Sequence, residues 1–452
     1  MRRICRRALA LWMLVAVLLG GLGYFGYEYW TKAEDWVLHS GSPHVYSGGS
    51  QMVSKGIVVD RDGVFLLSCD GGRIYCQDGD VRAAMVHWLG DRSGNIRSAV
   101  LDAYAKELVG FDRVNGVYGY SDETMTLTLS AQVQTVAMEA LGNYKGTIAV
   151  MDYRTGEILC AVSKPCFDPD AVPDISQEAF AGVYWNRFTQ AAYVPGSIFK
   201  IVTTAAALEW ETGVAQREFQ CTGRLTLPGG SVTCERAHGL QDMAQALKNS
   251  CNCYYADLTA SMGAQAMTDA VERYGVLSQV RFDGIGTAAG HFSVENAAAV
   301  ELAWAGIGQH TDLVNPCAFL RFVAAVANEG VAVTPVAVRS VGGKLVWHQE
   351  GGTPVMKVGT AKTVARMMRN NVQQGYGDQN FPAGLQVCAK SGTGEVDGTK
   401  KSYAMFTGFV ENAEYPLAFF VAVEDAGYGK QVCMPMVNKV LSACRTVLER
   451  EG

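Results

Sequence analysis

Several signatures of common enzyme classes are missing from this sequence. It contains no H-E-x-x-H, G-x-x-x-x-G-K-[S/T] or G-x-S-x-G stretch, which argues against a metalloprotease, a P-loop enzyme and an α/β-hydrolase. It has no internal repeat and no low-complexity segment, and its only basic block lies at the N-terminus. With a net charge of −6, nothing in the composition points to nucleic acid as a partner.

Charged residues are also scarce. They make up 18% of the 452 residues, while hydrophobic residues make up 49%. Soluble domains average about a quarter charged residues. The chain is too long for one average domain, so we expect two or three domains with a large core and a membrane segment.

The N-terminus predicts that membrane segment. Residues 8–27 form an uncharged, apolar run of the length that crosses a bilayer. Aromatic residues crowd its far end, as in an interfacial belt, and four arginines precede it: Arg2, Arg3, Arg6 and Arg7. The pattern predicts a cytoplasmic tail (1–7), a single-pass anchor in the cell membrane (8–27) and an extracytoplasmic remainder. A cleaved signal peptide is the rival interpretation, although Gly21-Leu-Gly23 is a weak cleavage site.

Cysteine is abundant, but its spacing argues against a metal site. None of the thirteen cysteines forms a C-x-x-C pair, and Cys251-x-Cys253 is not followed by a matching pair. We therefore expect no metal and no cofactor. Cys221 and Cys234 flank a Gly-containing segment that reads as a hairpin, so they are the best candidates for a disulfide.

The pattern divides the rest of the chain into a linker and two domains. Residues 28–54 are rich in Ser, Gly and His and read as a linker. Residues 55–145 form a small, mostly β domain. It has two strands around an Asp-Gly turn, a polar stretch, a strand at 125–130 and a helix at 131–141.

Residues 146–452 form the second domain. They open on an apolar hairpin with its turn at 153–156, and strands return from about residue 387. Helical patterns lie between, at 199–210, 240–262, 264–274, 316–328 and 360–372. Strands at both ends with helices between them indicate an α+β fold whose two ends meet in one sheet.

The first candidate for chemistry is Tyr193-Val-Pro-Gly-Ser-Ile-Phe-Lys200. Ser197 and Lys200 are three residues apart, so a helix brings the amine of the lysine to the hydroxyl of the serine. A nearby lysine with a pKa depressed by burial can activate a serine as a nucleophile. The spacing alone occurs by chance in many helices.

Two further triplets follow in the order that is typical of serine acyl-transfer enzymes. Ser250-Cys-Asn252 and Lys390-Ser-Gly392 come after Ser197-x-x-Lys200, and serine acyl-transfer enzymes carry S-x-x-K, S-x-N and K-T-G in that order. Taken singly, Ser250 and Asn252 could cap a helix and Lys390 could lie at a solvated strand end. Gly239 suggests that His238 belongs to a structural turn.

Over nearly its whole length the chain resembles class B penicillin-binding proteins, the monofunctional peptidoglycan D,D-transpeptidases. That family implies an antiparallel sheet with helices on both sides, a helical subdomain, a small mostly β pedestal at 55–145 and one transmembrane helix. The chain departs from it in a short pedestal and in Ser391, where threonine is usual; serine keeps the hydroxyl. The likeness rests on the three motifs and on Lys55–Gly63, Asp152–Leu159, Asn186–Lys200, His238-Gly239, Gly306-Ile-Gly-Gln309, Asn315-Pro316, Ala327–Gly330 and Met405–Phe409.

The resemblance assigns roles to the motif residues. Ser197 would attack the D-Ala-D-Ala stem peptide with Lys200 as base, and Ser250 would pass the proton towards the leaving amine. Asn252 would bind the substrate amide, and Lys390 would repel the charge of Lys200 and attract the terminal carboxylate. Ser391, Gly392 and Thr393 would bind that carboxylate, and the backbone N–H groups of Ser197 and Thr393 would form the oxyanion hole.

The resemblance leaves alternatives open. A D,D-carboxypeptidase or a β-lactamase would use the same acylation residues with water as acceptor, and a non-catalytic β-lactam sensor or scaffold is the rival from another class. The expected partners are peptidoglycan stem peptides, β-lactam antibiotics and a polytopic glycan polymerase in the membrane, because no glycosyltransferase domain is found. Elongation, division and sporulation are not distinguished.

Overall fold

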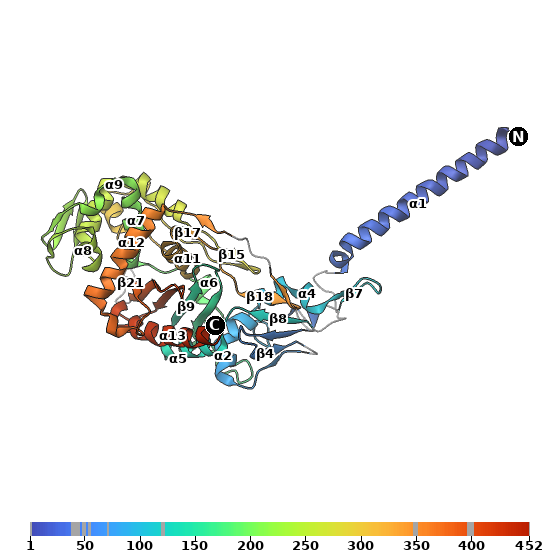
Figure 1. Cartoon of the computed structure of the whole chain (residues 1–452), viewed down its shortest axis with the longest axis horizontal. Coiled ribbons are helices and arrows are strands. Elements are labelled where there is room, and N and C mark those ends of the chain that lie inside the picture. Colours follow the sequence, from blue (N-terminus) through green and yellow to red (C-terminus); the bar gives the residue numbers. More distant parts are fainter. Residues whose placement is uncertain are drawn as a thin grey trace.

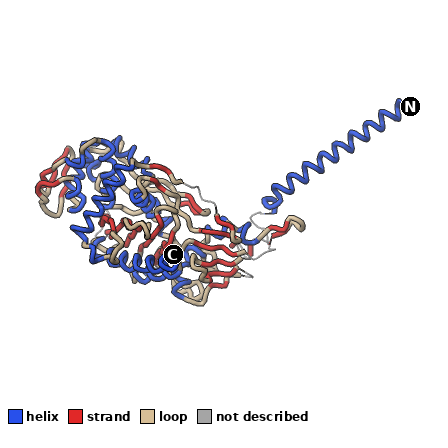
Figure 2. The backbone as a smooth tube through the Cα atoms, viewed as in Figure 1, coloured by secondary structure: helices blue, strands red, loops and turns tan. Residues whose placement is uncertain are grey.

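The computed structural model describes residues 2–37, 46–47, 51–52, 56–69, 72–118, 123–346, 351–395 and 402–451. A long N-terminal helix, α1 (Arg2–Val37), projects from an elongated body (Figures 1 and 2). Its segment Arg3–Ala33 is the one candidate membrane span among the described residues. An apolar helix of this kind fits the predicted single-pass anchor.

The helix continues ten residues past the predicted end of the anchor at residue 27. The first ten residues of the predicted linker (28–37) are therefore helical. Glu28 and Lys32 form an ion pair at 2.8 Å one turn apart, and Tyr29 packs against Trp36, so local contacts extend the helix. Within the rest of the predicted linker, β1 (Tyr46–Ser47) pairs with β2 (Gln51–Met52), and residues 38–45, 48–50 and 53–54 lie outside the described residues.

The smaller of the two main sheets has six strands, but each is only two to four residues long. Its order is β19-β18-β8-β3-β4-β5. The predicted strands around the Asp-Gly turn are β3 (Ile57–Val59) and β4 (Phe65–Ser68), and the next predicted strand is β8 (Thr124–Leu127). The other members are β5 (Ile74–Tyr75), β18 (Val338–Val341) and β19 (Lys344–Leu345). The last two come from the middle of the second predicted domain, which no local pattern indicated.

The stretch characterised from the sequence only as polar contains three helices in its described residues. They are α2 (Gly79–Leu89), α3 (Ala99–Ala103) and α4 (Ala105–Val109). Asp78 caps α2 by accepting hydrogen bonds from the backbone N–H groups of Asp80 and Val81. The indole of Trp88 donates to the carbonyl of Ala161 at 2.8 Å, so α2 fastens the smaller sheet to the larger one.

The larger sheet has five antiparallel strands in the order β10-β9-β23-β22-β21. The hairpin β9 (Gly146–Asp152) and β10 (Ile158–Lys164) lies beside strands from the end of the chain. These are β21 (Val387–Glu395), β22 (Ser402–Val410) and β23 (Leu417–Val423). The prediction that both ends of the domain meet in one sheet is confirmed, and β21 lies at the edge of that sheet.

Helices cover both faces of this sheet. On one face, α5 (Ala131–Leu141) and α13 (Gly429–Glu451) pack side by side, and α11 (Pro316–Ala327) packs on the other (Figure 1). The predicted helix at 131–141 has the expected bounds. It packs on the larger sheet, although its position in the sequence assigns it to the pedestal. Buried Gln134 accepts a hydrogen bond from the N–H of Ala161 at 2.8 Å, which ties α5 to β10.

A helical subdomain lies at the end of the molecule away from α1 (Figure 1). The helix predicted at 240–262 is instead two helices, because the chain turns at Ser250, whose φ is 53°. The subdomain is built from α7 (Lys200–Trp210), α8 (Met243–Lys248), α9 (Asn252–Tyr274), α10 (Ala299–Ala305) and α12 (Val358–Asn371).

Short elements complete the structure. The predicted hairpin between Cys221 and Cys234 is formed by β12 (Arg224–Leu227) and β13 (Gly230–Thr233). Beside it, β11 (Phe219–Cys221) pairs with β14 (Gly239–Gln241). The remaining pieces are α6 (Arg187–Gln190) and the strands β6 (Phe111–Asp112), β7 (Val117–Tyr118), β15 (Arg281–Phe282), β16 (Ile285–Gly286), β17 (Val331–Ala332) and β20 (Thr353–Pro354).

Candidate active site

Ser197 lies in a tight 3₁₀ turn, Gly196–Phe199, that runs directly into α7. The turn packs against the edge strand β21. A Cβ atom on Gly196 would lie 2.1 Å from the carbonyl oxygen of Thr393, and Gly196 has a φ of +53°, so only glycine fits here. Its N–H donates to the carbonyl of Gly308 at 2.8 Å. These contacts fix the serine beside β21.

Lys200 is fully buried at the first residue of α7. Its Nζ donates to Ser197 Oγ at 2.7 Å and to Asn252 Oδ1 at 2.7 Å. It also contacts the carbonyl oxygen and the hydroxyl of Ser250, at 2.9 Å and 3.2 Å. The predicted Ser197–Lys200 contact is therefore present.

Burial lowers the pKa of Lys200 from its usual 10.5 to about 8. Nearby cysteine thiols, led by Cys234, act in the opposite direction. From the sequence, both burial and repulsion from Lys390 were expected to lower this pKa, and loss of hydration on burial is the main cause. A pKa near 8 leaves a useful fraction of the amine neutral at physiological pH, which a base requires.

Ser250 and Asn252 reach Lys200 from the junction between α8 and α9. The amide nitrogen of Asn252 donates to the carbonyl of Thr233 at 2.9 Å, which orients its oxygen towards the lysine. The sequence left open a purely structural role for Ser250 and Asn252 as caps of α9. The capping side chain is instead that of Cys251, which accepts the N–H of Tyr254.

Lys390 is buried on β21 and is not at a solvated strand end. Its Nζ donates to Ser250 Oγ at 3.1 Å and to the carbonyl of Ser391 at 2.7 Å. Burial, with a smaller contribution from the charge of Lys200, holds the pKa of Lys390 well below its usual value. The hydroxyl of Ser250 thus lies between two lysine amines and can relay a proton.

Ser391 and Thr393 are half-buried on the same edge strand. The N–H of Ser391 donates to the hydroxyl of Tyr376 at 2.8 Å, and the carbonyl of Thr393 accepts from Gln309 Nε2 at 3.1 Å. Residues two apart on a strand point their backbone groups to the same side. The N–H of Thr393 therefore also faces away from β22. Between them, Gly392 packs so closely on the nucleophile turn that a Cβ would lie 2.9 Å from the N–H nitrogen of Ile198.

Sequence reasoning missed two residues of this site. Tyr376 ends a short π-helix, Val372–Tyr376, and its hydroxyl lies 2.9 Å from that of Ser391. No sequence pattern marks it. Gln309 stood in a stretch that carried the family resemblance, but the pattern gave it no role.

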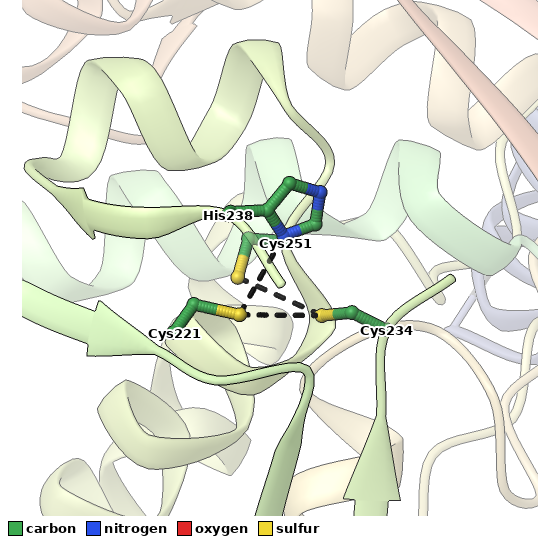
Figure 3. A group of neighbouring side chains, drawn as sticks. All are labelled: Cys221, Cys234, His238 and Cys251. Carbon is green, nitrogen blue, oxygen red and sulfur yellow. Dashed lines mark hydrogen bonds between the residues drawn. The ribbon is translucent and has the colours of Figure 1, made fainter. Parts of the chain in front are cut away.

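A second cluster includes Cys251, contradicts the predicted disulfide and supplies a group of side chains that could hold a metal ion (Figure 3). The predicted disulfide is not formed, because the sulfur atoms of Cys221 and Cys234 are 3.9 Å apart, and a bond requires about 2.05 Å. Both thiols instead belong to a group with His238 and Cys251 whose ligand atoms all lie within 4.8 Å of one another. The spacing argument against a metal site therefore fails, because it considered only cysteine pairs close in sequence. His238, which Gly239 suggested to be part of a structural turn, has its Nδ1 atom 3.6 Å from the sulfur of Cys221.

Comparisons with known proteins identify the family of this chain. The model of the penicillin-binding protein transpeptidase domain matches residues 146–442. Stage V sporulation protein D of Bacillus subtilis is 29% identical over 343 residues, which cover 70% of this chain and 52% of that protein. The peptidoglycan D,D-transpeptidase PbpA of Mycolicibacterium smegmatis is 27% identical over 66% of this chain and 67% of its own length. The chain thus spans about half to two-thirds of the length of these relatives.

Solved structures show the same fold. The D,D-transpeptidase domain of a peptidoglycan glycosyltransferase from Eggerthella lenta superposes with a TM-score of 0.76 and 25% identity, covering 88% of this chain and 99% of that one. Penicillin-binding protein A of Mycobacterium tuberculosis, as a ceftriaxone acyl-enzyme complex, gives a TM-score of 0.74 at 22% identity, covering 86% and 98%. With three ordered motifs around one buried lysine, the chain belongs to the penicillin-binding protein transpeptidase family, among its class B members.

Proposed function

We propose that this protein is a peptidoglycan D,D-transpeptidase that works through an acyl-enzyme on Ser197. The observation that carries the proposal is the buried amine of Lys200, 2.7 Å from Ser197 Oγ, with a pKa lowered to about 8. A neutral amine at this distance can take the proton of the hydroxyl as it attacks. The ceftriaxone acyl-enzyme of the mycobacterial protein with the same fold supports acylation by β-lactams.

The acylation step follows from the contacts. Ser197 Oγ adds to the carbonyl carbon of the penultimate D-alanine while its proton passes to Lys200 Nζ. The backbone N–H groups of Ser197 and Thr393 stabilise the oxyanion. The C–N bond then breaks, and the proton moves from Lys200 through the hydroxyl of Ser250 to the leaving amine. Free D-alanine departs, and Ser197 remains as an ester.

The second step runs in reverse with a different amine. The amino group of a neighbouring stem peptide adds to the ester, and its proton returns to Ser197 through the same relay. This forms the cross-link and restores the enzyme. Asn252 holds the substrate amide, while Lys390 with the hydroxyls of Ser391 and Thr393 attracts the terminal carboxylate.

The location and organisation of the protein form part of the proposal. The N-terminal arginines orient α1 with its start in the cytoplasm and the catalytic domain outside. We divide the body at about residue 145 into a pedestal (55–145) and a transpeptidase domain (146–452), although helix α5 packs on the larger sheet and strands β18 and β19 join the smaller one. The anchor and pedestal are the surfaces we assign to a polytopic glycan polymerase.

Labelling with fluorescent penicillin tests the proposal. Full-length protein in detergent should be labelled, Ser197→Ala should not, and Ser442→Ala, a control on the distant helix α13, should behave as wild type. Equal labelling of Ser197→Ala and wild type would exclude Ser197 as the nucleophile.

The acceptor is tested separately. A transpeptidase should keep the penicilloyl ester for many minutes and join a donor stem peptide to an added amine. Rapid release of hydrolysed penicillin, with no amine product, would instead indicate a carboxypeptidase or a β-lactamase.

A further inference from the structure

Four side chains from separate elements meet beside the Ser250–Asn252 motif (Figure 3). Cys221 ends β11, Cys234 follows β13, His238 precedes β14, and Cys251 is the N-cap of α9. Cys221 and Cys251 are buried, and the other two are half-buried. The group lies inside the subdomain and is not an accidental surface cluster.

Three of the six distances between these ligand atoms match those expected around a tetrahedral metal ion, and the whole set lies within 4.8 Å. Bonds of about 2.3 Å to sulfur and about 2.0–2.1 Å to nitrogen give tetrahedral edges of about 3.8 Å (S···S) and about 3.6 Å (S···N). The Cys221–Cys234 and Cys234–Cys251 sulfur distances are 3.9 Å and 3.7 Å. His238 Nδ1 lies 3.6 Å from the sulfur of Cys221.

Backbone N–H groups point at two of the four ligand atoms, a geometry that suits metal-bound thiolates. The N–H of Cys253 points at the sulfur of Cys234 at 3.3 Å, and the N–H of Tyr254 points at the sulfur of Cys251 at 3.4 Å. Both donors belong to the first turn of α9, where the helix dipole also favours negative charge.

We propose that Cys221, Cys234, His238 and Cys251 bind one Zn²⁺ ion that holds the Ser250–Asn252 motif in place. Three soft thiolates and one imidazole in a tetrahedron are a typical zinc set. Because all four ligands come from the protein, the site is structural and leaves no position for a water nucleophile.

The link to the active site is short. Cys251 lies between Ser250 and Asn252, and both neighbours contact Lys200 Nζ. The neighbouring hairpin is held too, because Asn252 Nδ2 donates to the carbonyl of Thr233, the residue before Cys234. An ion bonded to Cys234 and Cys251 therefore joins the hairpin to the start of α9. It fixes Asn252 from both sides.

Metal content is the first test. Full-length protein, purified in detergent with a phosphine reductant and no chelator, should contain one zinc per chain by elemental analysis. Cys221→Ser and His238→Ala should lower this content. Cys76→Ser, a half-buried thiol of the pedestal outside the cluster, should not. Wild-type protein without metal, whether its thiols are free or joined in a Cys221–Cys234 disulfide, would overturn the site.

A spectroscopic test needs no variant, so it remains informative if the ligand variants fail to fold. Wild-type protein loaded with Co²⁺ should show the strong visible bands of a tetrahedral ion and thiolate-to-metal charge transfer. Octahedral Co²⁺ spectra without charge transfer would overturn the ligand set.

The coupling of the metal to acylation rests on the proposed function and has its own test. Stripping the ion from the wild type should slow penicillin labelling about 10–100-fold, the usual effect of a positioning shell, and Zn²⁺ should restore the rate. An unchanged rate would overturn the coupling. Zinc bound without any labelling would count against the proposed function alone, and labelling without zinc against the metal site alone.

Discussion

Two buried clusters meet at Ser250-Cys-Asn252, and they are built in opposite ways. Around Lys200 and Lys390, each amine is supplied with oxygen acceptors from serine, asparagine and backbone carbonyls. Around Cys234, each described neighbour of the sulfur is another thiol or an N–H donor. The polar groups of the first cluster are hydrogen-bonded within the protein, whereas the second gathers three sulfur atoms and an imidazole around a common centre.

This difference indicates that one cluster takes part in the reaction and the other holds the backbone in position. Oxygen acceptors around a dry amine let a proton move between Lys200, Ser250 and Ser197 without a large change in structure. Thiolates and imidazole around a common centre do not exchange protons with a substrate, but they can hold a cation that fixes the backbone. The cluster at Lys200 is thus expected to react, and the cluster at Cys234 to hold the first in shape.

The largest effect should come from removing the reactive amine. Lys200→Met should slow penicillin acylation by about 10²–10⁴-fold, the usual contribution of a general base. Stopped-flow or gel-based labelling measures this rate. The control is Lys439→Met, which removes an exposed lysine on α13. A loss under tenfold at Lys200 would mean that the two clusters do not differ in reactivity as described.

The pH dependence of acylation by the wild type also tests whether Lys200 is the base. Lys200 acts when neutral and has a pKa of about 8, so the acylation rate should rise with pH and level off above about 8. At pH 6 about one amine in a hundred is neutral, so the rate should be about 100-fold below the plateau. A rate that is flat between pH 6 and 9 would rule out Lys200 as the base.

A smaller loss of acylation efficiency is expected from a substitution beside the edge strand β21. Tyr376→Phe removes the hydroxyl that accepts the N–H of Ser391 and contacts its Oγ. Hydrogen bonds of this kind contribute about 0.5–1.5 kcal/mol each, so acylation efficiency should fall about tenfold, mainly through weaker binding of carboxylate-bearing substrates. The aromatic ring keeps its packing against Phe406.

That prediction has a specific control. Tyr415→Phe removes an exposed hydroxyl near the end of α13 and should leave both binding and acylation unchanged. If Tyr376→Phe alters the maximal rate and leaves substrate binding intact, Ser391 does not act through the carboxylate.

The smallest effect should come from the thiol outside the proposed ligand set. Cys253→Ser keeps the backbone N–H that contacts Cys234 and can still donate to the carbonyl of Val232. Zinc content should stay at one per chain, and labelling should change less than about twofold, because the net worth of such a hydrogen bond is small. Loss of zinc in this variant would place Cys253 among the ligands.

How far the sequence predicts this molecule differs between the two clusters. Ser197 and Lys200 are three residues apart, so local geometry alone brings them together, and the order of the other motifs supplied the rest of the site. The ligands of the thiol cluster are separated by a hairpin and a helix. Their meeting depends on β11 pairing with β14 and on the break at Ser250, which tertiary contacts impose on an otherwise continuous helical pattern.

The same reason explains the differences in the fold. Long, periodic elements such as α5, α11 and the β9–β10 hairpin were predictable, because their apolar faces repeat along the sequence. Strands β18 and β19 were not predictable, because segments of two to four residues are too short to show a periodic pattern. In addition, β18 pairs with β8, which lies over two hundred residues away in the sequence. Tyr376 is positioned by a π-helix that likewise has no local signal.

The central claim is that Ser197 alone carries the acyl group. Peptide mapping by mass spectrometry of the full-length protein after treatment with penicillin tests it most directly. We predict one penicilloyl group per chain, on the peptide that contains Ser197, stable for long enough to be mapped. An adduct on Ser250 or on a cysteine of the neighbouring cluster, or no adduct at all on folded protein, would contradict the account.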